Sequence, residues 1–406
     1  MESNKNQTNW LGRIGSYLLV AALSAAISLA VYARMTKIRP LTGAEKLAEI
    51  QDLIDNYYIG EADPTDLMDG AAAGMVAGTG DKWAYYVSAA EMQSYEQSKE
   101  NRYVGIGITI ANEDNPLGFP IIAVEPDGPA MQAGILPGDI LSAANGHSAA
   151  EMGIDGSAGV IGGEPGTNVT ITVLRPTDSG EYETLEFDIR RETILVQVAK
   201  YTMLEDNVGY IRIANFNTNC AKQTIAAIED LQSQGATALV FDVRFNGGGY
   251  KHELVELLDY LLPEGDLFIS EDYSGAREID TSDSDCVKMP MAVLVNQDSY
   301  SAAEFFAAAL EEYDWAILGG SATSGKGHFQ STFTLSDGSA VNLSIGKYYT
   351  PNRVSLSDVG GLVPQYAEEM DEASQALLYS GLLEPKDDVQ LQKVLSALKT
   401  QSTIDD

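Results

Sequence analysis

The stretch ATALVFDVRFNGGGYKHELVELLDYLLP, residues 236–263, decides the fold of this 406-residue chain. Its first part is a short apolar run rich in Val, Leu and Phe, which is typical of a strand buried in a sheet. Three glycines at 247–249 then break the run, and apolar residues at helical spacing follow them. A buried strand, a glycine turn and a helix in that order predict one unit of an α/β protein.

The same alternation extends in both directions along the chain. Strands are predicted at 208–213, 291–296 and 315–320, and helices at 219–235 and 301–314. Strands that alternate with helices imply a largely parallel sheet. The loops at the carboxyl ends of such strands are available to form a site.

From Tyr103 the apolar pattern changes to a period of two, which predicts strands. The segment carries GIG at 105–107, PAxxAGIxxGD at 129–139, and an Asn-Gly pair at 145–146. In these marks it resembles a PDZ domain, which we place at 99–190. The alternative is a small β-domain whose glycines serve only turns. The resemblance implies that backbone N–H groups catch the terminal carboxylate of a peptide, which adds a strand to the sheet edge. The residues expected to bind it are Tyr103, Val104, Gly105, Ile106 and Gly107.

The amino terminus carries a long apolar stretch. Residues 14–33 contain no charged side chain and are flanked by Arg13 and Arg34. At about 1.5 Å per residue, a helix of about 20 residues crosses a hydrocarbon core of roughly 30 Å. The sequence Val31-Tyr32-Ala33 also suits the end of a cleaved signal peptide. Between the two, we expect an uncleaved transmembrane anchor at 14–34 after a short tail at 1–13.

Helical patterns lie on both sides of these regions. Residues 43–58 place apolar side chains on one helical face, and 64–80 are rich in small residues that permit close packing. We expect a helical lead at 40–98 and a helical segment at 376–406. Their role is packing, and formation of a homodimer through them is a further expectation.

Composition and rare residues exclude several classes of function. The formal net charge of −34 repels nucleic acid, so no nucleic-acid partner is expected. Cys220 and Cys286 are far apart and lack metal-ligand spacing, so both a disulfide and two free thiols stay open. We expect no metal and no organic cofactor. The three histidines form no convincing catalytic triad, and no G-x-S-x-G motif is present.

A lysine stands between two glycines at 325–327. Together with Gly320 it matches the G-x-x-x-x-G-K of a nucleotide-binding loop, but Gly327 occupies the place of the magnesium-binding Ser or Thr. The residues that follow alternate like two strands around Asp337 and Gly338, whereas a phosphate loop needs a helix there. We therefore expect Lys326 to act as a base in a water-poor site that lowers its pKa.

Ser301 begins the predicted helix at 301–314. The pattern Ser301-x-x-Glu304 is a capping box, so a helix cap is the alternative to a nucleophile. A serine hydroxyl is a weak nucleophile and needs a base such as Lys326. An oxyanion hole needs backbone N–H groups, which Ala302 offers on one side. The glycine turn offers the others, at Gly248 and Gly249.

In these motifs the chain resembles the C-terminal processing peptidases, the tail-specific S41-type serine proteases with a Ser-Lys dyad. The marks are GAxxGM at 70–75, Gly-Asp at 80–81, DVRFNGGG at 242–249, SAAE at 301–304, GKGHFQ at 325–330 and YYTP at 348–351. The resemblance implies that Ser301 attacks, Lys326 is the base and Gln330 holds the lysine. Gln330 is expected on the same strand face as Lys326. The departures, Val243 for Leu and Ala303 for Ser among them, leave the dyad intact.

The resulting expectation is an α/β protease core with a mixed sheet at 191–375, an inserted β-rich PDZ domain, a helical N-terminal lead and one N-terminal transmembrane helix. The chain is expected to cut proteins near free apolar C-termini. Its catalytic part would lie outside the cytoplasm on a bacterial cell membrane. The alternatives are a non-catalytic PDZ scaffold that binds C-termini and a nucleotide-dependent protein. The intact set of Ser301, Lys326 and Gln330 favours the protease.

Overall fold

The computed structural model describes residues 5–35, 40–111, 115–177 and 179–402. The chain divides into two units, Met1–Ala72 and Ala73–Asp406. The first four residues of the expected N-terminal tail and the last four of the expected C-terminal segment lie outside the described residues.

The N-terminal part is helical. Helix α1 (Lys5–Met35) contains the 21-residue segment Gly12–Tyr32, which is long and apolar enough to cross a membrane. The predicted apolar helix is therefore present, and a signal sequence would meet the same criterion as an anchor. Helix α2 (Gly43–Tyr57) begins with a capping box between Thr42 and Glu45. Helix α3 (Pro64–Ala77) follows, and α4 (Met92–Lys99) comes after a short strand.

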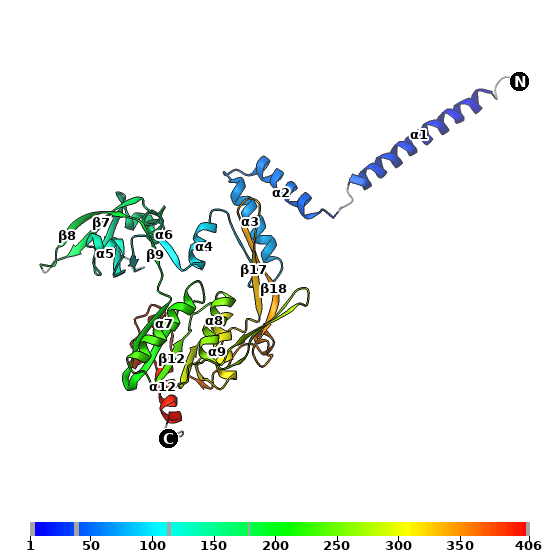
Figure 1. Cartoon of the computed structure of the whole chain (residues 1–406). Helices are drawn as coiled ribbons and strands as arrows, with labels where there is room; N and C mark the ends of the chain where they lie inside the picture. The colour runs from blue at the N-terminus through cyan, green and yellow to red at the C-terminus, as the bar shows by residue number, and fades with distance from the viewer. Residues whose placement is uncertain (1–4, 36–39, 112–114, 178, 403–406) are drawn as a thin grey trace. The chain divides into compact units, whose positions relative to one another are not determined.

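The second unit is organised around a six-stranded mixed sheet (Figure 1). The strands pair in the order β10-β11-β12-β15-β16-β19, and only the β10–β11 pair is antiparallel. Their bounds are β10 (Ala199–Met203), β11 (Val208–Ile213), β12 (Ala238–Asp242), β15 (Met291–Val295), β16 (Ala316–Gly320) and β19 (Tyr366–Ala367). The predicted mixed sheet is confirmed, and the apolar runs of β12 and β15 are buried along their whole length because helices cover both faces.

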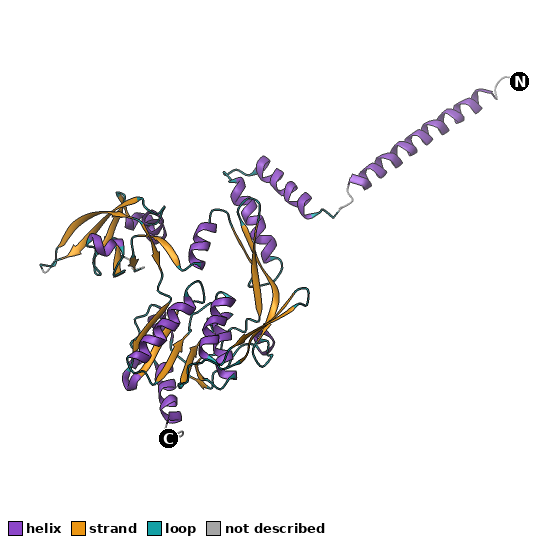
Figure 2. Cartoon of the chain, viewed as in Figure 1, coloured by secondary structure: helices purple, strands orange, loops and turns teal. Residues whose placement is uncertain are grey.

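Helices form a layer on each face of this sheet (Figure 2). On one face α7 (Cys220–Ser233), α8 (Lys251–Leu261) and α9 (Ala302–Glu312) pack against side chains such as Phe241 and Val293. On the other face α12 (Val389–Ser402) packs against the alternate side chains, among them Val240 and Leu294. Burying both faces removes the most apolar surface from water.

A second sheet has five strands. It consists of β1 (Tyr85–Val87), β13 (Gly265–Asp272), β14 (Arg277–Ser282), β17 (His328–Thr334) and β18 (Ala340–Tyr349). Strands β17 and β18 are the predicted hairpin around Asp337 and Gly338. Since a strand and not a helix follows Lys326, the nucleotide-loop alternative is wrong.

The β-rich segment has a sheet and a core of its own. Strands pair in the order β3-β4-β5-β7-β8, with β6 (His147–Ser148) on β5, so β3 forms an edge. The bounds are β3 (Ile108–Ile110), β4 (Phe119–Val124), β5 (Ile140–Ala144), β7 (Asn168–Pro176) and β8 (Tyr182–Arg190), with helices α5 (Pro129–Ala133) and α6 (Ala149–Ile161). A separate ribbon joins β2 (Arg102–Gly105) to β9 (Glu192–Leu195). Two more helices, α10 (Leu356–Val359) and α11 (Glu372–Tyr379), lie near the C-terminus.

A buried ion network fixes the end of β12. The guanidinium of Arg244 bonds to Asp242 at 2.6 Å and to Asp388, just before α12, at 2.7 Å. Burial by itself would raise the pKa of Asp242, but Arg244 holds it below the usual range. Asp242 and Arg244 of the DVRFNGGG motif thus connect the glycine turn to the segment that begins α12.

Candidate active site

Ser301 occupies the turn between β15 and α9. Its backbone has φ 59° and ψ −125°, a conformation that an L-residue rarely adopts and that is strained. Its side chain caps no N–H group of the helix, so the helix-cap alternative is wrong. A hydroxyl on a sharp turn between strand and helix is instead the arrangement that exposes a nucleophile.

The hydroxyl of Ser301 lies beside the phenol of Tyr348. Burial raises the pKa of Tyr348, and a hydrogen bond from Ser301 opposes that rise. The Tyr348 hydroxyl donates in turn to the carbonyl oxygen of Lys326. Its ring packs in the core against Phe268 in a tilted arrangement and against Phe305 edge to face, at centroid distances of 5.4 and 5.6 Å.

Lys326 is buried, with 8% of its surface exposed. Its Nζ lies 4.5 Å from the ring centroid of Trp83 and 5.7 Å from that of Tyr300, and within the described residues it forms no ion pair or hydrogen bond. Burial, together with the nearby positive charges of Lys99 and Lys82, lowers the pKa of Lys326 to about 8. Asp81 opposes this shift. A neutral amine, as predicted for a base, is therefore accessible near physiological pH.

The two glycines beside Lys326 permit a close approach to other backbone. A Cβ on Gly325 would lie 2.8 Å from the carbonyl carbon of Gly360, and Gly325 also has a φ of 72°. A Cβ on Gly327 would lie 2.8 Å from the backbone nitrogen of Ser357. The glycines let the lysine segment pack directly on the 357–361 segment.

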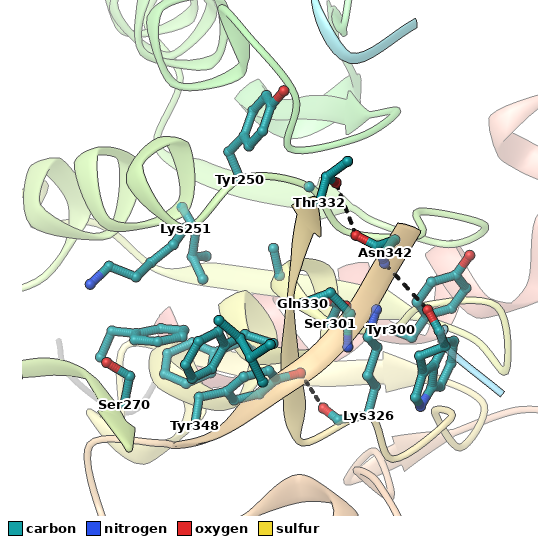
Figure 3. Close-up of a pocket in the computed structure, with 18 of the residues that line it drawn as sticks. Tyr250, Lys251, Ser270, Tyr300, Ser301, Lys326, Gln330, Thr332, Asn342 and Tyr348 are labelled. Carbon is teal, nitrogen blue, oxygen red and sulfur yellow. Dashed lines mark hydrogen bonds between the residues drawn. The ribbon is translucent and has the colours of Figure 1, made fainter. Parts of the chain in front are cut away.

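These groups line one pocket of about 950 Å³ (Figure 3). Ser301, Lys326 and Gln330 all contribute to it, and Phe268, Phe305 and Tyr348 form an apolar part of its wall. The structure therefore brings the three predicted catalytic side chains together around one cavity.

The glycine turn offers one of the two amides expected, at Gly249, and another at Gly247. The N–H of Gly248 donates to Oδ1 of Asn246 at 2.8 Å, so the prediction of a free amide at Gly248 is wrong. Gly247 and Gly249 line the pocket, and among the described residues their N–H groups have no acceptor. The N–H of Ala302 is also available, because the first N–H groups of a helix have no partner within the helix. An oxyanion hole is thus open to Ala302, Gly247 and Gly249.

Gln330 lines the pocket but is held by other partners. Its amide nitrogen donates to the carbonyl of His328 at 2.9 Å and to the hydroxyl of Ser344 at 3.1 Å. The expectation that Gln330 and Lys326 share one strand face is wrong, because β17 begins at His328 and has a register shift between Phe329 and Gln330. A hold of Gln330 on the lysine stays a prediction.

Sequence reasoning missed the part played by Glu304. Its carboxylate is fully buried and accepts the N–H of Gly325 at 2.8 Å and the N–H of Lys326 at 2.9 Å. The hydroxyl of Thr323 donates to it as well. Burial raises the pKa of Glu304, and these hydrogen bonds oppose the rise.

Trp83, Tyr300 and Tyr348 were also missed as neighbours of the lysine, although Trp83 follows the Gly-Asp mark and Tyr348 belongs to YYTP.

The residues expected to bind a peptide carboxylate lie at the start of the β-rich segment. Tyr103, Val104 and Gly105 belong to β2, which pairs with β9. Ile106 is buried in the core of the β-rich segment, and Gly107 has a φ of 82°. The edge strand β3 follows directly. Binding there stays a prediction.

Cys220 and Cys286 are both free, so they form no disulfide.

Comparison with known proteins gives consistent matches. The model of peptidase family S41 matches residues 207–367, and a PDZ domain model matches 121–175. The carboxy-terminal processing protease CtpA of Bacillus subtilis is 30% identical over 332 residues, which are 81% of this chain and 69% of that protein. The chloroplastic carboxyl-terminal-processing peptidase 2 of Arabidopsis thaliana is 32% identical over 301 residues, 70% of this chain and 58% of that protein.

The fold also has a counterpart among solved structures. A structure described as an S41 protease from Bacteroides fragilis covers 91% of this chain and 99% of its own, with a TM-score of 0.52 and 18% identity. That likeness concerns the fold alone. The sequence similarity to CtpA extends over both the PDZ segment and the catalytic segment, and on that ground the chain belongs to the S41 family of serine-type, PDZ-containing carboxy-terminal processing peptidases.

Proposed function

We propose that this peptidase cuts proteins near a free, apolar C-terminus, with Ser301 as nucleophile and Lys326 as general base. The observation that carries this proposal is the burial of Lys326 in the pocket that Ser301 lines, with its pKa lowered to about 8. Ser301 has a strained backbone and no capping bond, which also suits a nucleophile.

In this mechanism, Oγ of Ser301 attacks the scissile carbonyl carbon while Nζ of Lys326 takes its proton. The oxyanion of the tetrahedral intermediate accepts from the N–H groups of Ala302 and of Gly247 or Gly249. The C–N bond then breaks, and Lys326 returns the proton to the leaving amine. Water attacks the resulting ester, Lys326 accepts its proton, and the acid is released with the proton restored to Ser301.

The PDZ domain, which we place at 99–190, would receive the substrate's C-terminus. Its edge strand β3 has one unpaired side where a peptide strand can add. Gly107 and the residues before it would bind the carboxylate. The names of the curated relatives, which speak of carboxy-terminal processing, support this assignment.

We further propose that α1 stays uncleaved and anchors the chain, so that the catalytic part works outside the cytoplasm of a bacterial cell. Its apolar segment of 21 residues supports this. In α2, Ile50, Leu53 and Tyr57 are exposed, which is compatible with the expected homodimer.

The test is cleavage of fluorescently labelled casein by the full chain purified in detergent. Ser301→Ala and Lys326→Ala should each abolish cleavage while the protein stays folded, whereas Lys347→Ala, a change at an exposed lysine, should retain it. Cleavage by the Lys326→Ala variant at the wild-type rate would reject the dyad. Amidating the C-terminus of a peptide substrate should weaken its binding. An unchanged KM would reject the proposal that the PDZ domain binds the terminal carboxylate.

A further inference from the structure

Both polar groups of the Lys326 main chain are held by side chains. Its N–H donates to the carboxylate of Glu304 at 2.9 Å, and its carbonyl oxygen accepts from the hydroxyl of Tyr348. Glu304 and Tyr348 are 0% and 3% exposed. Main-chain groups in a loop more often bond to water or to other backbone. Two buried side chains that bond to the main-chain N–H and C=O of the same residue are therefore a specific arrangement.

Glu304 and Ser301 lie on the same short element. Ser301 immediately precedes α9 and Glu304 lies within its first turn, so the helix holds the two at a fixed separation. The carboxylate therefore ties the lysine segment to the element that carries the serine. Tyr348 makes a second tie, since its hydroxyl contacts both Ser301 and the carbonyl of Lys326.

We propose that Glu304 and Tyr348 form a clamp on the main-chain N–H and C=O of Lys326 that positions its amine for Ser301, a role for two residues that rests on the function proposed above. Both are positioning residues that need not touch the substrate: Glu304 acts through Lys326, and Tyr348 acts through Lys326 and Ser301.

The chemistry of the contacts suits this role. The Glu304 carboxylate accepts from the hydroxyl of Thr323 and from the N–H groups of Gly325 and Lys326, and the N–H of Leu362 also lowers its pKa by hydrogen bonding. An acceptor-only carboxylate suits this set of donors. The carboxylate bonds to the main chain of Lys326 and makes no ion pair with Nζ. A direct ion pair would favour the ammonium and disable the base. The clamp thus fixes the lysine while leaving its amine beside the rings of Trp83 and Tyr300. Of the charged groups that act on the amine, Lys99 and Lys82 favour its neutral form and Asp81 favours its charged form.

Two variants remove the clamp with little change of shape. In Glu304→Gln the amide NH₂ would face one of the N–H donors, and in Tyr348→Phe the carbonyl of Lys326 would lose its donor. The chain offers matched controls at the far end of the same helix. Glu312 accepts from Asn352 N–H at 2.8 Å and from the hydroxyl of Thr350, and Tyr313 donates to the carbonyl of Asp266 at 2.9 Å. Neither lines the pocket.

The experiment compares Glu304→Gln and Tyr348→Phe with Glu312→Gln and Tyr313→Phe in the full chain in detergent. It measures kcat and KM on labelled casein, the pH profile of kcat/KM and the thermal midpoint. In the clamp variants kcat should fall by about a hundredfold, the loss expected from misplacing a catalytic group by an ångström, with KM nearly unchanged. The rising limb of the pH profile should also move to higher pH. The reason is that water solvates the charged form of a displaced amine, which raises the pKa of Lys326.

The controls should lose thermal stability to a similar extent and keep both kcat and the pH profile. Clamp variants whose kcat and pH profile match those of the controls would overturn the clamp. If Glu304→Gln does not fold, the pH profile of Tyr348→Phe decides, because loss of its contact with Ser301 would lower kcat without moving the limb that reports Lys326. The ring contacts of residue 348 with Phe268 and Phe305 remain in this variant. A wild-type chain that does not cleave casein, or a Ser301→Ala chain that cleaves as fast, would overturn the proposed function and the clamp with it.

Discussion

The Nζ atom of Lys326 lies 4.5 Å from the centre of the Trp83 ring and 5.7 Å from that of the Tyr300 ring. The Trp83 and Tyr300 rings are themselves 5.0 Å apart. Aromatic faces attract an ammonium, but they also exclude the water that would solvate it. Burial prevails, and the pKa of Lys326 falls to about 8.

The first prediction concerns the pH dependence of cleavage. A general base must be unprotonated, so kcat/KM should rise with pH through an apparent pKa near the value of about 8 that burial gives Lys326. A pH series of casein cleavage by the full chain measures it. A profile that is flat between pH 6 and 9 would contradict the assignment of Lys326 as the base.

Lys99 provides a test of the electrostatic cause. Its positive charge lowers the pKa of Lys326, so Lys99→Gln should shift the rising limb to higher pH by a few tenths of a unit. Higher salt should shrink that difference, because salt screens charges near solvent. Lys222→Gln, on an exposed position of α7, is the control and should leave the limb in place. A shift to lower pH in the Lys99 variant would contradict this account.

Lys326 should reduce the stability of the folded protein. A pKa that falls from 10.5 to about 8 corresponds to about 3 kcal/mol of preference for the uncharged amine. The folded state binds fewer protons than the unfolded state between these values, so wild-type stability should rise as pH increases from 8 to 10.5. Lys326→Met should therefore be more stable than wild type at pH 7, by up to about 3 kcal/mol. Denaturant unfolding at pH 7 and pH 10 measures this, and an equal difference at both pH values would argue against the buried charge as its cause.

Gly248 should tolerate no side chain. Its φ is 87°, and a Cβ would lie 2.7 Å from Cβ of Ser301 and 2.8 Å from the nitrogen of Ala302. Gly248→Ala should therefore displace the nucleophile, with a loss of activity of about a hundredfold or more and a stability cost of about 1–3 kcal/mol. Gly235→Ala is the matched change, because Gly235 has a similar φ of 93° and a Cβ there would meet nothing within 4 Å. Equal activities of the two variants would show that the turn does not constrain Ser301.

Local pattern was a reliable guide to the elements of this protein. Buried strands β12 and β15 were readable because helices on both faces require continuous apolar runs. The β17–β18 hairpin was readable from its alternation and its Asp-Gly turn. The capping box at Ser301 was misleading, since the same Ser-x-x-Glu spacing serves a cap in one context and a tertiary contact in another. A local sequence pattern describes only its own segment. Tertiary packing decided that this Ser-x-x-Glu pattern forms a tertiary contact and not a helix cap.

The sequence by itself determined which segments are buried and in what order strands and helices alternate. Those properties follow from the hydrophobic effect and from backbone sterics, which act over a few residues. Tertiary structure alone decided that Trp83 shields Lys326, that Asn246 uses the amide of Gly248, and that Glu304 holds the main chain of the lysine. Each of these contacts joins groups whose pairing depends on three-dimensional packing and on competition among nearby donors and acceptors, and spacing along the chain does not encode either.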